Sequence, residues 1–235
     1  MADQAAHAHS GFRRDPGAAN TEAVEDYAKA IHALARHGDG PVGTSALADR
    51  LGVSPGTVTS MLKRMAAMGL VEHEPYHGVT LTPAGEKVAL EVIRHHRLIE
   101  AYLAEALGMP WDRVHDEAEV LEHYISEELE ERMAEALGDP VVDPHGDPIP
   151  DRRLSLRVDE GATLAEFESG RRGVLQRVSD SDPEMLRYLD ERGIRPGVAL
   201  TVREREPFGG ATVVEVEGGA RHSIGDALAR RMVVT

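Results

Sequence analysis

The stretch from His115 to His123 carries the side chains with the clearest chemical use, and it reads His-Asp-Glu-Ala-Glu-Val-Leu-Glu-His. In a helix, Glu119, Glu122 and His123 would share one face, because residues three and four apart are neighbours there. Two carboxylates and an imidazole packed this closely repel one another, and a divalent cation would offset that repulsion. The pattern predicts a metal site. The alternative interpretation is a solvated acidic helix face.

A second pair of candidate ligands, His96 and Glu100, lies one helical turn apart in the preceding segment. Such a pair alone is more often a surface hydrogen bond than a pair of metal ligands. The chain has no cysteine, so any metal must be held by nitrogen and oxygen atoms.

Two helices are expected to position these side chains. Apolar spacing predicts one helix from Pro83 to about Leu107, and a second that includes His115 to His123 and continues to about Leu137. Two long amphipathic helices joined by a short turn are typical of a dimerisation unit. We therefore expect a helical dimerisation and metal-binding domain over residues 91–153, ending in a linker rich in proline and glycine over residues 138–153.

The N-terminal region has the pattern of a helix-turn-helix. A first helix, which carries Asp26, is predicted over Thr21–Arg36 with Thr21 as its N-cap. A short helix over Ser45–Leu51 then ends at Gly52, and Ser54 caps a second helix. This succession is a helix-turn-helix signature.

Two short strands around a turn at His77-Gly78 follow, which predicts a winged helix-turn-helix over residues 21–90. The outward residues at the start of the second helix are short or basic, which suits a helix lying in a DNA major groove against phosphates. These candidate DNA-binding residues are Ser54, Pro55, Gly56, Thr57, Thr59, Ser60, Lys63 and Arg64. The alternative is a helix-turn-helix that serves only as a packing element.

Both ends of the chain differ from its middle. Residues 154–235 contain four strand-like segments and one short helix near residues 184–192, which predicts a small SH3-like β-barrel. Residues 1–20 lack the apolar stretch of a secretory signal and are predicted to be a disordered leader. The expected fold class is mainly α and multidomain.

Composition limits the classes of function. Hydrophobic residues make up 41% of the chain, and no apolar run approaches the roughly 20 residues needed to span a bilayer, so no membrane partner is expected. The lack of cysteine fits a cytoplasmic protein. The formal net charge of −15 argues against non-specific coating of nucleic acid. Local DNA binding is compatible with it, because each bound divalent ion shifts the charge by about +2.

Four signatures resemble the diphtheria-toxin-repressor family of metal-dependent transcriptional regulators. They are Ser54-Pro-Gly-Thr-Val-Thr, His96-Arg97-Leu98 with Glu100, the run from Val114 to His123, and His145-Gly-Asp-Pro-Ile-Pro. The resemblance covers nearly everything after residue 20. It implies a homodimer of three-domain chains, each with a DNA-binding domain, a dimerisation domain carrying two metal sites, and a mobile SH3-like (FeoA-like) domain.

The resemblance also implies the ligands of both sites. The primary site would comprise Asp26, Glu119, Glu122 and His123, and the ancillary site His96, Glu100, His115 and Asp180. Iron-sensing members have Met and Cys at the positions of Asp26 and Glu119, whereas manganese-sensing members have Asp and Glu, as here. Carboxylate-rich sites without sulfur suit Mn²⁺, so Mn²⁺ is expected and Fe²⁺ is the second activator. Because Lys29 stands where two-domain manganese sensors have a Glu, one ion per primary site is expected.

The expected function is a manganese-activated repressor of metal-uptake genes that binds palindromic operator DNA as a homodimer and is not an enzyme. An iron-responsive regulator of the same family is the first alternative. A winged-helix regulator that answers an organic ligand or a partner protein is the second. A metal-dependent hydrolase is the third, and it would need an open coordination position and a substrate cleft.

Overall fold

The computed structural model describes residues 18–36, 38, 40–74, 77–157 and 161–235. The chain divides into two compact units, one that ends at Ala89 and one that begins at Leu90. Helix α4 (Pro83–Glu105) begins in the first unit and continues in the second. No helix in the described part of the chain combines the length and the apolar character needed to span a membrane.

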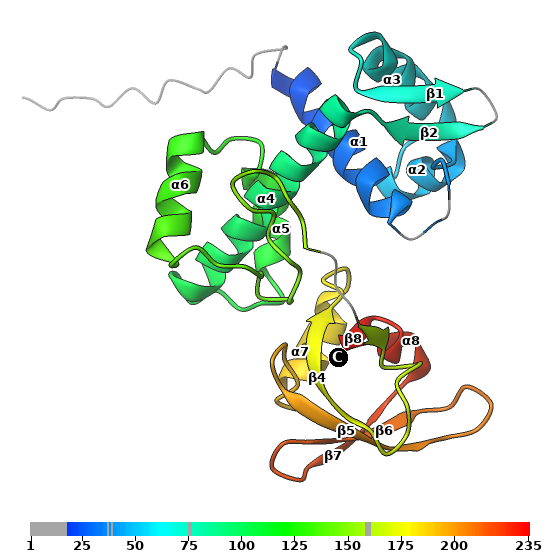
Figure 1. The fold of residues 1–235 in the computed structure, drawn as a ribbon, viewed down its shortest axis with the longest axis vertical. Helices are drawn as coiled ribbons and strands as arrows, with labels where there is room; N and C mark the ends of the chain where they lie inside the picture. Colours follow the sequence, from blue (N-terminus) through cyan, green and yellow to red (C-terminus); the bar gives the residue numbers. More distant parts are fainter. Residues whose placement is uncertain (1–17, 37, 39, 75–76, 158–160) are drawn as a thin grey trace, which may run out of the picture. The chain divides into compact units, whose positions relative to one another are not determined.

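The described residues of the first unit form α1, α2, α3, a wing of strands β1 and β2, and the start of α4 (Figure 1). Its elements are α1 (Ala18–Ala35), α2 (Thr44–Leu51), α3 (Pro55–Ala67), β1 (Val71–Glu74) and β2 (Gly78–Leu81). The prediction of Thr21 as the N-cap of the first helix is wrong, because residues 18–20 are already helical. Of the predicted leader, residues 1–17 lie outside the described residues.

The helix-turn-helix forms as the sequence predicts. Gly52 ends α2 in the left-handed conformation with φ 65°, which glycine adopts at no steric cost. The Ser54 hydroxyl then accepts a hydrogen bond from the Thr57 amide at 3.1 Å, capping α3. Strands β1 and β2 pair antiparallel in the register Val71↔Leu81, which makes the wing. The winged helix-turn-helix prediction is therefore confirmed.

The helical part of the second unit departs from the prediction. The single helix expected to run on to about Leu137 is instead two helices, α5 (Val114–Leu121) and α6 (Glu127–Ala136). The break has a local cause, because the Ser126 hydroxyl accepts a hydrogen bond from the Leu129 amide at 3.2 Å and so caps a new helix. Glu122 and His123 consequently lie in the turn after α5, not within a helix.

The segment over residues 138–153 has no helix or named strand, as predicted, but it is more than a linker. Asp143, His145 and Ile149 are all buried. An isolated bridge joins Val142 to Pro148, and the Arg97 guanidinium donates a hydrogen bond to the Pro148 carbonyl. This segment therefore packs as part of the second unit.

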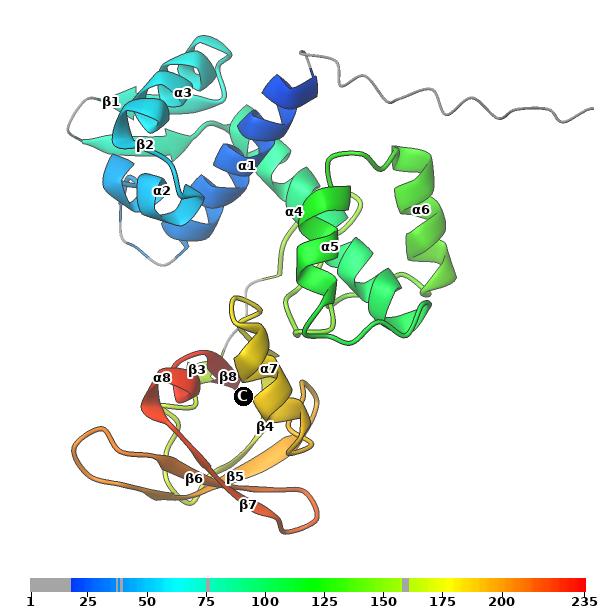
Figure 2. The ribbon, with the colours of Figure 1, turned by 180° about the vertical axis from the view of Figure 1, so that it is seen from behind.

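The C-terminal part of the second unit, here called the sheet domain (residues 161–235), is a six-stranded antiparallel sheet with two short helices. Figure 2 shows α7 and α8 at one end of it. The strands follow the order β3-β8-β4-β5-β6-β7. The elements are β3 (Ala162–Thr163), β4 (Arg172–Val178), α7 (Pro183–Asp190), β5 (Ala199–Arg205), β6 (Thr212–Val216), β7 (Arg221–Ile224), α8 (Asp226–Ala229) and β8 (Met232–Val234). The prediction missed β3, β7 and α8, which are each two to four residues long.

Candidate metal centre

Helices α4 and α5 bring three of the predicted ancillary ligands together. His96 and Glu100 project from one face of α4, with the His96 Nε2 atom 3.1 Å from Glu100 Oε1. His115, in the first turn of α5, places its Nδ1 atom 3.3 Å from the same Glu100 oxygen and 3.2 Å from His96 Nε2. Glu100 is completely buried, so its carboxylate depends on these partners.

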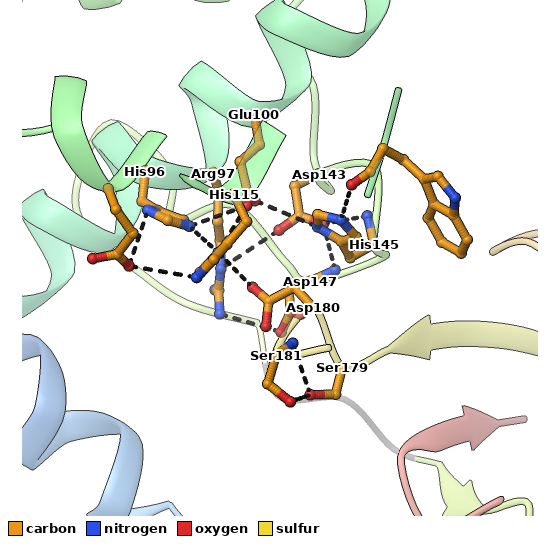
Figure 3. A network of polar contacts seen from close by, with 12 residues as sticks. His96, Arg97, Glu100, His115, Asp143, His145, Asp147, Ser179, Asp180 and Ser181 are labelled. Atoms are coloured by element: carbon orange, nitrogen blue, oxygen red, sulfur yellow. Dashed lines mark hydrogen bonds and ion pairs between the residues drawn. The ribbon is translucent and has the colours of Figure 1, made fainter. Parts of the chain in front are cut away.

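The fourth predicted residue comes from the sheet domain. Asp180 follows β4, and its Oδ2 atom lies 3.2 Å from His115 Nδ1 (Figure 3). One ligand atom from each of His96, Glu100, His115 and Asp180 lies within 4.8 Å of the others. These four residues are called the ancillary cluster below. The sequence assignment of Asp180 thus agrees with the geometry, although its role as a ligand stays a prediction.

Charges in the ancillary cluster are tightly paired. Burial raises the pKa of Glu100, but the charge of His96 and contacts with His115 and His145 outweigh burial and hold that pKa well below its ordinary value. Hydrogen bonds to Asp180 and Glu100 raise the pKa of His115 to about 10. The carboxylates are therefore ionised at neutral pH, which is the form that binds a cation.

Two residues that were not predicted as ligands stand beside this cluster. Asp143 and His145 belong to the buried proline-rich segment and form a second group of potential ligands with Glu100. Burial lowers the pKa of His145, but Glu100, together with the charge of Asp143 and the hydrogen bond to the Trp111 carbonyl, raises that pKa to about 9. Burial, with the charges of Glu100 and Asp147, raises the pKa of Asp143 well above its ordinary value. The sequence signal was the signature that begins at His145, to which no ligand role was assigned.

Three buried polar atoms of this group lack a hydrogen bond, which tests whether the group suits a metal. Glu100 Oε2 and His145 Nδ1 are buried without a hydrogen-bond partner and lie 3.6 Å apart. Asp143 Oδ2 is likewise buried without one. Buried polar atoms are nearly always satisfied, and two oxygens and one imidazole nitrogen without sulfur are donors for a hard divalent cation. The residues present therefore fit a metal ion.

The predicted primary ligands of the second unit also lie together. His96 Nδ1 is 2.5 Å from Glu122 Oε2 and 3.7 Å from Glu119 Oε1. His123 Nε2 lies 3.6 Å from Glu122 Oε1. Glu119, Glu122 and His123 are called the primary cluster. His96, predicted only for the ancillary site, contacts both clusters through its two ring nitrogens.

A buried ion network holds the turn that carries Glu122. The His95 ring nitrogen Nδ1 donates to the Glu122 carbonyl at 3.1 Å, and its Nε2 lies 3.1 Å from a Glu130 carboxylate oxygen on α6. Arg94 also pairs with Glu130. Hydrogen bonding to both partners requires a protonated imidazole. Burial lowers the pKa of His95, but Glu130, together with the Glu122 carbonyl and the charge of Glu91, raises that pKa above its ordinary value. Helix α6 thereby fixes the position of a candidate ligand.

Asp26 belongs to the first unit, on the half-buried side of α1. Its participation in the primary site stays a prediction, resting on the family resemblance.

The candidate DNA-binding residues line the outward side of α3. Val58, Leu62 and Met65 are its buried residues. All eight candidates lie outside this core; Thr59 is partly exposed and the others are exposed. The eight are Ser54, Pro55, Gly56, Thr57, Thr59, Ser60, Lys63 and Arg64. Their side chains are thus available to a groove, as the sequence predicts.

Comparison with known protein families covers three consecutive parts of the chain. Residues 20–79 match the family described as "Iron dependent repressor, N-terminal DNA binding domain". Residues 82–151 match "Iron dependent repressor, metal binding and dimerisation domain", and residues 162–235 match "FeoA domain".

Individual relatives agree with these matches. The "Transcriptional regulator MntR" of Escherichia coli is 42% identical over 118 residues, covering 50% of this chain and 75% of that protein. The "Iron-dependent repressor IdeR" of Mycobacterium bovis is 32% identical over 206 residues, covering 82% and 88%. A solved "Manganese-dependent transcriptional repressor complex with manganese" has a TM-score of 0.84 at 39% identity, covering 90% of this chain and 99% of that one. The "manganese regulator SloR" has a TM-score of 0.72 at 31% identity, covering 90% and 97%.

Proposed function

The chain belongs to the iron-dependent (diphtheria-toxin) repressor family of metal-dependent transcriptional regulators, and on this premise we propose that it is a manganese-activated, DNA-binding repressor of the cytoplasm. We assign Asp26, Glu119, Glu122 and His123 to the primary site, and the ancillary cluster with Asp143 and His145 to a second site. The observation that supports manganese as the activating ion is the set of candidate ligand atoms, which are oxygen and nitrogen without sulfur. The similarity to manganese-dependent repressors supports the same ion. The similarity to a relative named as an iron-dependent repressor makes Fe²⁺ the alternative activator.

The mechanism follows from where the ligands belong in the chain. Asp26 is on α1 of the DNA-binding unit, whereas Glu119, Glu122 and His123 are in the second unit. A bound Mn²⁺ supplies two positive charges that can be shared by carboxylates which otherwise repel one another. By sharing one ion, Asp26 and the primary cluster would restrict the DNA-binding unit to fewer positions. The dimer would then present its two α3 helices at the spacing of a palindrome, about 34 Å.

The carboxylate and histidine groups are assigned to sensing and not to hydrolysis. Glu100, Glu122 and His145 are buried among packed helices and the proline-rich segment, whereas a hydrolytic site needs room for substrate and water. The relatives found by comparison are transcriptional regulators.

Calorimetric titration of the full chain with Mn²⁺ tests the proposal. We expect saturable binding in two classes, one for the primary and one for the ancillary site. Asp180→Ala is expected to weaken the ancillary class alone, because the Asp180 carboxylate contacts His115 of the ancillary cluster. A titration without saturable heat would contradict the proposal and would favour a regulator that answers an organic ligand.

The dimer is assigned to the apolar surface around α5. Val120 is 62% exposed, and Leu121, Tyr124 and Leu129 are 39%, 48% and 48% exposed. Exposed large apolar side chains are typical of a homodimer interface, whose core is more apolar than other protein surface. The family resemblance supports a second copy of this chain as the occupant.

Glu in place of Val120 is therefore expected to convert the dimer to a monomer, because a charge would be buried without a partner in the interface. Light scattering on a size-exclusion column measures the mass directly. Phe208→Glu is the matched control, since Phe208 is fully exposed in the sheet domain, between β5 and β6. A Val120→Glu chain that still elutes as a dimer would place the interface elsewhere.

A further inference from the structure

One tryptophan links the helical part of the second unit to the sheet domain. Trp111 lies in the turn between α4 and α5, so the chain of the helical part contributes it. It is nevertheless 4% exposed and belongs to the hydrophobic core of the sheet domain, packed in one cluster with Leu164, Leu175 and Leu186. A helical-domain side chain therefore completes the core of another domain.

The neighbours of Trp111 come from three segments. Its carbonyl accepts a hydrogen bond from His145 Nε2 at 2.7 Å, and its ring stacks on the His145 ring with centroids 5.7 Å apart. The Arg195 guanidinium lies 5.5 Å from its ring centroid. The next residue, Asp112, pairs with Arg187 of α7 at 3.0 Å. Trp111 is thus fixed to the proline-rich segment and to the sheet domain at once.

The ancillary cluster depends on the same junction. His115 follows Trp111 by one helical turn in sequence, and Asp180 is the cluster member from the sheet domain. The His115 and Asp180 side chains are 32% and 30% exposed. Ion pairs that remain partly solvated contribute little to holding two elements together, whereas a buried tryptophan contributes strongly through its large apolar area. The packing of Trp111 therefore holds the helical part to the sheet domain more strongly than the ion pair between His115 and Asp180 does.

His145 is held at the same junction. The Val178 amide of β4 donates to the His145 carbonyl at 2.9 Å. The adjoining Gly146, with φ 88°, lies so close to β4 that a Cβ there would come within 1.9 Å of the Gln176 carbonyl oxygen. The His145 backbone is therefore bound to the sheet domain while its ring is bound to Trp111.

We propose that Trp111 is the positioning residue of the ancillary metal site: its insertion into the sheet-domain core holds Asp180 against His115 and His145 against Glu100. This rests on the proposed function, because it treats the cluster as a metal site. The family resemblance implies a mobile sheet domain, and the inference assigns to Trp111 the main contact that restricts this mobility.

The test compares three full-length variants in Mn²⁺ titrations. Each variant is also combined with Glu122→Gln, which impairs the primary site, so that the remaining class of Mn²⁺ binding can be assigned to the ancillary site. Trp111→Ala is expected to weaken the ancillary class about 10- to 100-fold, the usual cost of removing a group that orients ligands, and to leave the primary class within about twofold. Trp111→Phe, which still fills the core, is expected to retain most of the affinity. Phe167→Leu, in the same core, controls for general loss of stability.

X-ray scattering of the chelator-treated chains gives a readout independent of metal. Trp111→Ala is expected to increase the radius of gyration, because the sheet domain is released, while Phe167→Leu leaves it unchanged. Unaltered scattering and unaltered ancillary affinity in Trp111→Ala, or an equal loss of affinity in Phe167→Leu, would overturn the inference. If the unmodified chain binds no Mn²⁺, the proposed function fails, and scattering alone still decides whether Trp111 pins the domain.

Discussion

Glu122→Gln is expected to abolish manganese-dependent DNA binding while leaving the fold intact. Glu122 is 1% exposed and touches both His96 and His123. The amide keeps the shape but removes the negative charge. Loss of one partner of a buried charge contact costs roughly 2–5 kcal/mol, and about 1.4 kcal/mol is a factor of ten. The affinity of the primary site for Mn²⁺ should therefore fall by about 30-fold or more.

Fluorescence polarisation measures this effect with a labelled duplex recovered from a random-sequence library by selection with the unmodified chain and Mn²⁺. Glu117→Gln is the matched control, because Glu117 is an exposed residue of α5, the helix that immediately precedes Glu122. The control removes the same charge and should bind as before. If Glu122→Gln bound DNA at the manganese concentration that the unmodified chain requires, the assignment of Glu122 to the primary site would be wrong.

Asp26→Asn is expected to separate metal binding from DNA binding. The ancillary cluster lies wholly within the second unit, so this change should leave its affinity for Mn²⁺ unaltered. The primary site loses its one ligand from the DNA-binding unit, and with it the tie between the two units. We therefore expect one class of manganese binding to persist. Fluorescence polarisation with the selected duplex should show at least a tenfold loss of DNA affinity, which corresponds to a loss of about 1.4 kcal/mol or more in binding free energy.

Glu22→Gln is the control for this variant, since Glu22 lies one helical turn before Asp26 on α1. It changes the charge of the same helix without removing the assigned ligand. Equal DNA binding by Asp26→Asn and the unmodified chain would mean that Asp26 does not couple the two units. Equal losses in both variants would point to the net charge of α1 instead.

The DNA-binding unit was predictable because its signals are local. Gly52 is the residue that a left-handed helix end favours, and Ser54 with Pro55 is a start signal that depends only on neighbouring backbone groups. The structure bears out both. The start of α1 was mistaken because Thr21 resembles an N-cap, although the helix continues through it from Ala18.

The sequence also contains a local signal for the break between α5 and α6, but the apolar spacing on both sides led to the prediction of a single helix. Ser126 followed by Glu127 and Glu128 is a helix start, with acidic residues in the first turn. The helical spacing of apolar residues continues on both sides of the break, so this spacing alone predicts one continuous helix. Hydrogen bonding of the Glu122 carbonyl to His95 is a tertiary contact that no local pattern reveals.

The residues of the candidate site likewise include some that local spacing predicts and others that only tertiary contacts bring together. His96 and Glu100 share a helix face, so their meeting follows from spacing alone. The contact of Asp180 with His115 joins residues 65 positions apart and was reached through the family resemblance. Asp143 and His145 were missed because the loop that carries them has no periodicity. Their burial beside Glu100 depends on Trp111 and β4, which lie elsewhere in the sequence.

The most direct test of the account is whether Mn²⁺ alone turns DNA binding on. The unmodified chain is incubated with the random-sequence duplex library in Mn²⁺ or in chelator, and retained duplexes are sequenced and then titrated by polarisation. The account predicts enrichment of a palindrome in Mn²⁺, with binding that disappears in chelator and returns when Mn²⁺ is restored. Equal enrichment and equal affinity in chelator, or no enriched sequence with Mn²⁺ bound, would contradict it.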